Sequence, residues 1–152
     1  MKDYKAKNIR NVVFAGHASA GKTSLVEAAY YLTGKSDRLG TVAEGNTVSD
    51  FDAEEIRRKS SISASVVPCE WKDVKLNIID TPGFFDFVGE VEEAISAADA
   101  AIIVVNGKAG IEVGTKKAWE LCEKYKLPRM FFVTHMDIDN ASYRQVVEDL
   151  TA

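Results

Sequence analysis

The stretch that decides the fold is Gly16-His17-Ala18-Ser19-Ala20-Gly21-Lys22-Thr23, which matches the phosphate-binding pattern G-x-x-x-x-G-K-[ST]. The apolar segment 11–15 before it predicts a buried strand, and residues 24–32 after it predict a helix. Glycines permit the tight turn in which successive backbone N–H groups point at phosphate oxygens, and the helix N-terminus adds partial positive charge. In such a loop Lys22 reaches the β- and γ-phosphates and the Thr23 hydroxyl binds Mg²⁺. A loop that merely joins a strand to a helix is the weaker alternative, because strand, motif and helix follow one another in register.

Length and composition indicate an ordinary globular chain. It has 152 residues and a net charge of −4, which suits one domain with a sizeable core. No stripe of basic residues is visible, so we expect no direct DNA binding. The longest apolar run, 100–105, is too short to span a bilayer, and we expect no membrane contact. Cys69 and Cys122 lack metal-ligand spacing and are interpreted as reduced core thiols of a cytoplasmic protein.

Strand and helix patterns alternate along the chain. The predicted strands are 9–15, 62–71, 75–80, 100–105 and 129–134, and the predicted helices are 24–32, 88–97, 113–125 and 141–150. This alternation predicts an α/β fold with a mostly parallel sheet and helices on both faces. The polar pair Lys72-Asp73 predicts a short turn, so strands 62–71 and 75–80 should form one antiparallel hairpin edge.

Several side chains are assigned to the interior or to helix ends. We expect Val91, Ala94 and Ile95 on one face of their helix, Trp119, Leu121 and Cys122 pointing inward, and Asn140 or Ser142 capping the last helix. Residues 33–60 are polar and contain several glycines, without sustained periodicity apart from a helical turn over 53–59. A stretch of this kind inside a compact domain is usually functional or disordered.

A second motif, Asp80-Thr81-Pro82-Gly83, ends a predicted strand. An Asp at that position beside the phosphate loop can hold Mg²⁺, often through water, and the Gly83 N–H can contact a γ-phosphate. Alone this tetrapeptide is weak evidence, because Asp and Pro-Gly mark many turns. Downstream of the phosphate loop it favours a nucleoside triphosphatase.

A third motif, Thr134-His135-Met136-Asp137, follows the last predicted strand. The Asp137 carboxylate could accept hydrogen bonds from N1–H and N2–H₂ of guanine. Adenine carries a lone pair at N1 and would leave that carboxylate unpaired, which gives base selectivity. An ordinary surface Asp after a strand is an equally good interpretation of this motif taken alone.

On these motifs the chain resembles the G domain of translational GTPases, specifically elongation factor G and its paralogues. The resemblance spans about 9–150 and is carried by residues 16–24, 80–87 and 104–112. It implies a P-loop NTPase fold, GTP and GDP as ligands, Mg²⁺, and the ribosome as partner. The residues that it implies bind nucleotide are His17, Ala18, Ser19, Ala20, Gly21, Lys22, Thr23, Ser24, Gly83, Thr134, His135 and Asp137, and those that it implies hold the metal are Thr23, Ser61 and Asp80.

The chain departs from the family pattern at three places. Phe84 stands where the family has the His that positions the attacking water, and Phe offers no donor or acceptor. We therefore assign no catalytic side chain and expect slow hydrolysis by the isolated chain. Thr134 and His135 replace the family's Asn and Lys, and Ser19 replaces an Asp. Ser61, by contrast, keeps the hydroxyl of the family's switch I Thr.

The family's G domain continues with a further strand, a helix and a loop that contacts guanine. We therefore expect residues 1–152 to form a partial G domain, with later G-domain elements and downstream factor domains absent. Strand 129–134 should then be an apolar sheet edge, and the piece should tend to self-associate.

The main interpretation is a GTP-binding, Mg²⁺-dependent GTPase switch module of an elongation factor G-like translation factor. A tetracycline-resistance ribosomal protection factor has the same kind of G domain. Two other classes stay open: a nucleotide-binding module that no longer hydrolyses GTP, and a P-loop ATPase or kinase. Asp137 and the length of the resemblance argue against the last.

Overall fold

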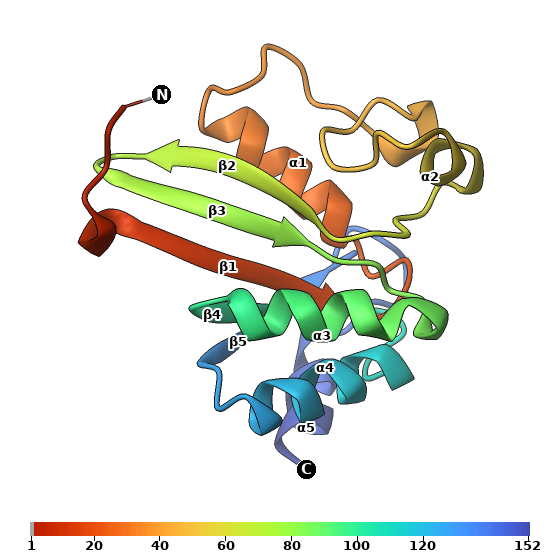
Figure 1. Ribbon diagram of the computed structural model, residues 1–152. Coiled ribbons are helices and arrows are strands. Elements are labelled where there is room, and N and C mark those ends of the chain that lie inside the picture. The colour runs from red at the N-terminus through yellow and green to blue at the C-terminus, as the bar shows by residue number, and fades with distance from the viewer. Residues whose placement is uncertain (1) are drawn as a thin grey trace.

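The computed structural model describes residues 2–152 and shows a five-stranded sheet (Figure 1). Its strands are β1 (Ile9–Gly16), β2 (Ser65–Trp71), β3 (Val74–Asp80), β4 (Ala100–Asn106) and β5 (Arg129–Thr134). Their order is β2-β3-β1-β4-β5, with β2 and β3 antiparallel and all other neighbours parallel. The predicted α/β fold with one antiparallel hairpin edge is confirmed.

Helices cover both faces of this sheet. They are α1 (Lys22–Leu32), α2 (Ala53–Arg58), α3 (Val88–Ala97), α4 (Val113–Lys124) and α5 (Tyr143–Thr151). Alternate residues of β4 point to opposite faces, which is why a continuous apolar run suits a strand buried on both sides. Ala101, Ile103 and Val105 join α3, α4 and α5 in one core, and Val104 joins α1 in the other. Short 3₁₀ turns occupy Ala6–Asn8, Val42–Glu44 and Phe85–Phe87.

Predicted features of the helices and of the hairpin are largely confirmed. Ala94 and Ile95 are the buried residues of α3. Lys72 and Asp73 form the turn between β2 and β3. The Ser142 side chain caps α5 by accepting from the backbone N–H of Gln145. Cys69 and Cys122 are buried free thiols in the two different cores.

Strand β2 begins three residues later than predicted, at Ser65 rather than Ile62. The backbone N–H groups of Ile62 and Ser63 donate to the Glu55 carboxylate instead of a neighbouring strand. The N–H of Ala64 donates to Glu90 in the same way. The carboxylates of Glu55 and Glu90 thus bind the backbone N–H groups of residues 62–64, which a longer β2 would need for pairing with a neighbouring strand.

The prediction that Trp119 points inward is wrong, since its residue is 41% exposed. Helix α4 presents Ala118, Leu121 and Cys122 to the sheet, and this places Trp119 at the margin of the contact. There its ring stacks on Phe131 with 5.6 Å between centroids, and the Arg129 guanidinium covers it at 3.7 Å. The Trp119 ring is therefore packed between Phe131 and Arg129 at the edge of the helix–sheet contact, not in the core.

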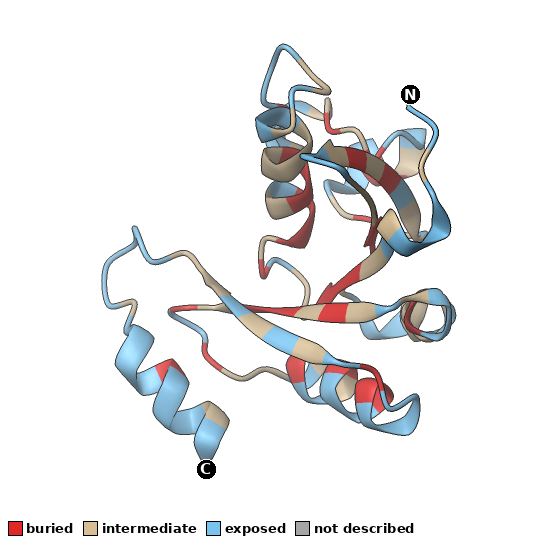
Figure 2. Ribbon diagram, turned by 90° about the vertical axis from the view of Figure 1, so that its left-hand side faces the viewer, coloured by how far each residue is buried: buried red, intermediate tan, exposed pale blue. Residues whose placement is uncertain are grey.

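Burial is uneven along the fold. Buried residues follow the central strands and the inner sides of the helices, whereas most of the C-terminal helix is exposed (Figure 2). Val146 is the one fully buried side chain of α5. Strand β5 pairs only with β4 within residues 2–152, as predicted for an edge. No helix in this part of the chain has the length and apolar character needed to cross a membrane.

Candidate functional site

The phosphate-binding motif lies between β1 and α1. Gly16 leaves β1 with a φ of 143°, and a Cβ there would stand 2.4 Å from the carbonyl oxygen of Val104 on β4. Gly21 adopts a φ of 90° and is the N-cap of α1. Both glycines hold backbone conformations that other residues rarely adopt. The loop therefore closes tightly over the N-terminus of α1, which starts at Lys22 rather than at Ser24 as predicted.

Lys22 bends back over this loop. Its Nζ donates to the carbonyl oxygens of Gly16 and His17, at 3.1 and 2.8 Å. The residue is 6% exposed, and burial lowers the pKa of the ammonium to about 8 against the opposing effect of Asp80 and Asp50. A phosphate in front of the loop would supply the anionic partner that favours the charged ammonium.

A cluster of hydroxyls and carboxylates lies beside Lys22. Thr23 Oγ1 and Ser61 Oγ are 3.2 Å apart, and Ser61 Oγ donates to Asp50 Oδ1 at 2.6 Å. Ser49 Oγ donates to Asp80 Oδ2 at 2.7 Å. Burial raises the pKa of the Asp80 carboxyl to about 6, while hydrogen bonds from Ser49 and Thr23 oppose that rise.

This cluster fits a magnesium ion. Asp50 Oδ2 and Asp80 Oδ1 are buried and have no hydrogen-bond partner among the described residues. Mg²⁺ takes oxygen ligands, usually one or two carboxylates with hydroxyls, waters and phosphate oxygens. The described residues hold no group of three or more His, Cys, Asp and Glu side chains arranged for a metal. Phosphate or water oxygens would therefore complete the shell.

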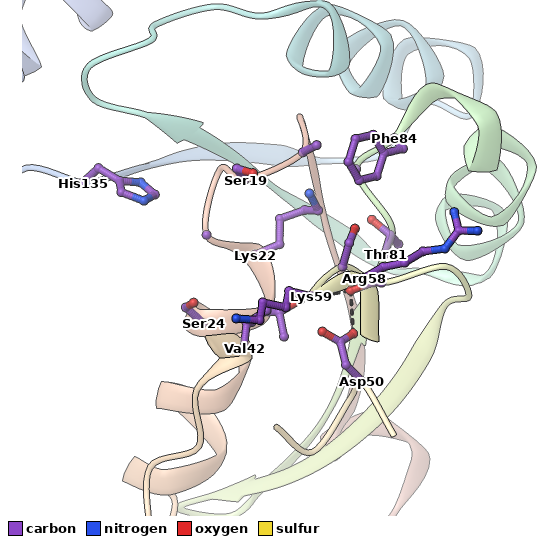
Figure 3. Close-up of a pocket in the computed structure, with 16 residues that line it drawn as sticks. Ser19, Lys22, Ser24, Val42, Asp50, Arg58, Lys59, Thr81, Phe84 and His135 are labelled. Carbon is purple, nitrogen blue, oxygen red and sulfur yellow. Dashed lines mark hydrogen bonds between the residues drawn. The ribbon is translucent and has the colours of Figure 1, made fainter. Parts of the chain in front are cut away.

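A cavity of about 320 Å³ opens in front of the loop (Figure 3). Of the predicted nucleotide residues, those that line it are Ala18, Ser19, Gly21, Lys22, Thr23, Ser24, Gly83 and His135, whereas His17, Ala20, Thr134 and Asp137 do not. Of the predicted metal residues, Thr23 and Ser61 line it, and Asp80 lies buried behind them. Phe84, 49% exposed, lies at its wall.

His17 turns toward α4 instead of the cavity. Its Nδ1 accepts from the backbone N–H of Gly114 at 3.2 Å, and its Nε2 lies 3.4 Å from Glu112 Oε1. His17 and Gly114 line a second cavity of about 50 Å³, and Phe84 lines this cavity as well as the first. Only the backbone of His17 therefore belongs to the phosphate loop, where its carbonyl holds Lys22.

The third motif contacts the loop through its first two residues. Thr134 Oγ1 donates to the Ala20 carbonyl at 2.6 Å. This threonine, which stands where the family pattern has a longer Asn, therefore braces the phosphate loop. His135 has a left-handed φ of 54° and lines the cavity. Asp137 is exposed and lies outside the cavity lining.

The site contains residues that the sequence prediction missed. Glu27 on α1 is buried, and its carboxylate accepts from the N–H groups of Gly40 and Val48, at 3.0 and 2.8 Å. Glu55 is buried as well and accepts from Ile62 and Ser63. The helical turn predicted over 53–59 is confirmed as α2, and the spacing Asp52-x-x-Glu55 is the capping-box pattern at its start. No local pattern marks Glu27, Ser49 or Asp50, because their partners are distant in sequence.

Comparison with known proteins agrees with this architecture. The family model described as "Elongation factor Tu GTP binding domain" matches residues 7–152. Elongation factor G 2 of Borreliella afzelii (strain PKo) is 41% identical over 93% of this chain and 21% of its own length. The mitochondrial ribosome-releasing factor 2 of Anopheles gambiae is 40% identical over 95% of this chain and 20% of its own.

Solved structures give the same result. A crystal structure of a protein from Thermus thermophilus has a TM-score of 0.90 and 42% identity, covering 93% of this chain and 21% of that one. A bacterial selenocysteine-specific elongation factor has a TM-score of 0.76 and 26% identity, covering 93% and 22%. The chain thus spans about a fifth of the length of the relatives that it matches. It belongs to the family of the elongation factor Tu GTP binding domain.

Proposed function

We propose that this chain is the GTP-binding, Mg²⁺-dependent switch module of an elongation factor G-like translation factor that acts on the ribosome. One observation carries the proposal: Asp50 Oδ2 and Asp80 Oδ1 are buried without a hydrogen-bond partner among the described residues, in carboxylates that adjoin the bonded hydroxyls of Thr23, Ser49 and Ser61. The cluster adjoins a phosphate loop with a buried lysine. The names of the relatives, elongation factor G 2 and ribosome-releasing factor 2, support the ribosome as partner.

Each residue of the cavity would have a distinct part in binding. The loop amides and Lys22 would hold the β- and γ-phosphates. Thr23, Ser61 and Asp80 would hold Mg²⁺, which when bound neutralises phosphate charge. Asp50 would fix the Ser61 hydroxyl, to which it already bonds at 2.6 Å. Gly83 would contact the γ-phosphate through its N–H group.

Titration with labelled GTP and ATP, with and without Mg²⁺, tests this function. We expect GTP to bind with micromolar affinity or somewhat weaker, about −8 kcal/mol or less in magnitude, and more tightly with Mg²⁺. Asp80→Asn should remove most of the gain from Mg²⁺. Asp73→Asn, in the exposed hairpin turn, is the control and should leave that gain intact. Equal affinities for GTP and ATP would contradict the guanine-binding part of the proposal.

Guanine recognition is assigned to Asp137. The side chain is exposed and follows the cavity-lining His135 by two residues in the chain, and exposure leaves its carboxylate accessible to a base. Asp137→Asn should shift preference toward xanthine nucleotides, because an amide donates where the carboxylate only accepts. An unchanged preference would mean that Asp137 does not face the base.

We propose that residues 33–61 act as the switch. Ser61 would gain contacts to Mg²⁺ and phosphate only when a γ-phosphate is present. Hydrogen exchange over 33–61 should therefore slow with a GTP analogue and not with GDP. Equal exchange with both ligands would show that the segment does not sense the γ-phosphate.

Self-association and location follow from the exposed surface and the relatives. Met130 and Phe132 are exposed on β5, the strand that has one partner strand within residues 2–152. An apolar edge of this kind favours pairing between copies, and sedimentation over a range of concentrations would reveal it.

We expect a cytoplasmic protein, although the names of some relatives place them in mitochondria.

A further inference from the structure

Three lysines of this chain hold a left-handed backbone conformation. Lys59, Lys72 and Lys126 have φ values of 54°, 54° and 52°. This conformation brings Cβ too close to the backbone and is unfavourable for residues other than glycine. Lys59 ends α2, Lys72 lies in the β2–β3 turn and Lys126 follows α4, and all three are exposed. Of the three, only Lys59 lines the cavity in front of the phosphate loop.

The backbone around Lys59 is fixed from both sides. Lys59 caps the C-terminus of α2, and its N–H donates to the carbonyl of Ile56 at 3.3 Å. The next N–H, of Ser60, donates to the carbonyl of Glu55 at 3.1 Å, and the Glu55 side chain holds Ile62. The direction of the Lys59 Cα–Cβ bond is therefore set by the fold of this segment.

That direction leads into the cavity. Lys59, Val42 and Ser24 all line the cavity in front of the phosphate loop (Figure 3). Ser24 belongs to the first turn of α1, whose N-terminus favours anions. Lys59 thus shares a cavity with the first turn of α1.

Other cations of the cavity already have partners. Lys22 donates to two loop carbonyls, and Arg58 pairs with Glu54. Lys59, by contrast, forms no ion pair with any described residue. The left-handed φ of Lys59 is explained by its place at the C-terminus of α2. The position of its ammonium, without an ion pair at the wall of an anion site, is what points to a ligand contact.

We propose that Lys59 is a nucleotide-binding residue, which contributes its ammonium to the phosphates of the bound nucleotide on the α1 side of the cavity. The inference rests on the proposed function, because the ligand is the nucleotide of that same site. It adds a positive charge from the switch segment to the charge supplied by Lys22. The segment would then be drawn onto the phosphates by Lys59 as well as by Ser61.

Matched charge variants test this role. Lys59→Gln and Lys72→Gln change the net charge equally and keep a residue with Cβ at a left-handed position. Binding of a non-hydrolysable GTP analogue at low salt should weaken about tenfold in Lys59→Gln, the range of one hydrogen bond to a charged group. Lys72→Gln should bind like the unsubstituted chain, and Lys59→Arg should retain most of the affinity. The tenfold difference should shrink at high salt, because salt screens exposed charges.

The outcomes separate this inference from the proposed function. If the unsubstituted chain does not bind the analogue, the proposed function itself is wrong. If it binds, and Lys59→Gln binds equally well or loses no more than Lys72→Gln, Lys59 does not contact the nucleotide. Loss of affinity in both Lys59→Gln and Lys59→Arg would also overturn the inference, because the charge would then not be the cause. Thermal unfolding of each variant would confirm that the compared chains are folded.

Discussion

The phosphate loop and the segment 33–61 meet at one cavity but are held in different ways. The loop is fixed by short-range features: two glycines with positive φ, and a lysine bonded to its own loop carbonyls. The segment is held by two buried glutamates: Glu27 accepts from the N–H groups of Gly40 and Val48 within it, and Glu55, itself part of the segment, accepts from Ile62 and Ser63 just beyond it. The loop has restraints within itself as well as the brace from Thr134, whereas the segment depends on a few side-chain contacts. We therefore expect the segment to be released more easily than the loop.

The largest effect is expected where the phosphate loop passes β4. In Gly16→Ala the new Cβ would stand 2.4 Å from the Val104 carbonyl, and φ is positive as well. We expect the free energy of unfolding to fall by about 3–5 kcal/mol, measured by urea unfolding.

Gly34→Ala is the matched control, because Gly34 also has a positive φ but meets nothing within 4 Å. It should cost only about 1–2 kcal/mol, the strain of the left-handed conformation. Equal losses in the two variants would mean that the close approach to β4 does not constrain the loop.

A smaller effect is expected for segment 33–61. Glu27→Gln replaces one accepting oxygen by a donor that faces a backbone N–H, and should weaken the segment locally by about 1–3 kcal/mol. Hydrogen exchange should quicken at Gly40 and Val48 and stay unchanged in the phosphate loop. Glu120→Gln, on the exposed side of α4, is the control. Faster exchange in the loop as well would show that the two regions are not held independently.

The local origin of the phosphate loop explains what the sequence could predict. Its glycines, Lys22 and the flanking strand and helix are neighbours in the chain, so their pattern alone located them. The same holds for the hairpin turn at Lys72 and the cap at Ser142. These features depend on backbone geometry over a few residues.

The contacts of segment 33–61 could not be predicted from the sequence, for the opposite reason. Glu27 binds backbone groups thirteen and twenty-one residues further along the chain, and Ser49 binds Asp80, thirty-one residues away. Such pairs leave no periodic pattern. Trp119 was misplaced because its partner, Phe131, lies on another element. His17 was predicted to bind nucleotide from its motif position, which does not reveal that its ring turns to Gly114.

Phe84 offers a further test, since it lines the cavity at which the two regions meet. Phe84→His would place a hydrogen-bonding group there, and single-turnover GTP hydrolysis should rise at least tenfold, about 1.4 kcal/mol in activation free energy. Phe85→His, at the next and more exposed position, should leave the rate unchanged. A fast reaction in the unsubstituted chain would point to another group that orients water.

The smallest effect concerns backbone strain at the end of α2. Lys59→Gly and Lys72→Gly each remove a Cβ at a φ of 54°. Relief of strain outweighs the conformational entropy of glycine, so each should stabilise the fold by about 0.5 kcal/mol in thermal unfolding. Stabilisation at Lys72 without stabilisation at Lys59 would mean that contacts of the Lys59 side chain offset its strain.

The central place of β1 has a consequence for synthesis of the chain. β1 pairs with β3 and β4, which the ribosome makes long after residues 9–16 have left it. At about 5–20 residues per second, the nascent β1 waits on the order of seconds for its first partner. During that interval Val12, Val13 and Phe14 present an apolar, unpaired strand to the cell. Nascent-chain binders should therefore engage this segment until Val74–Asp80 emerges, and release it when β3 and then β4 close the sheet around it.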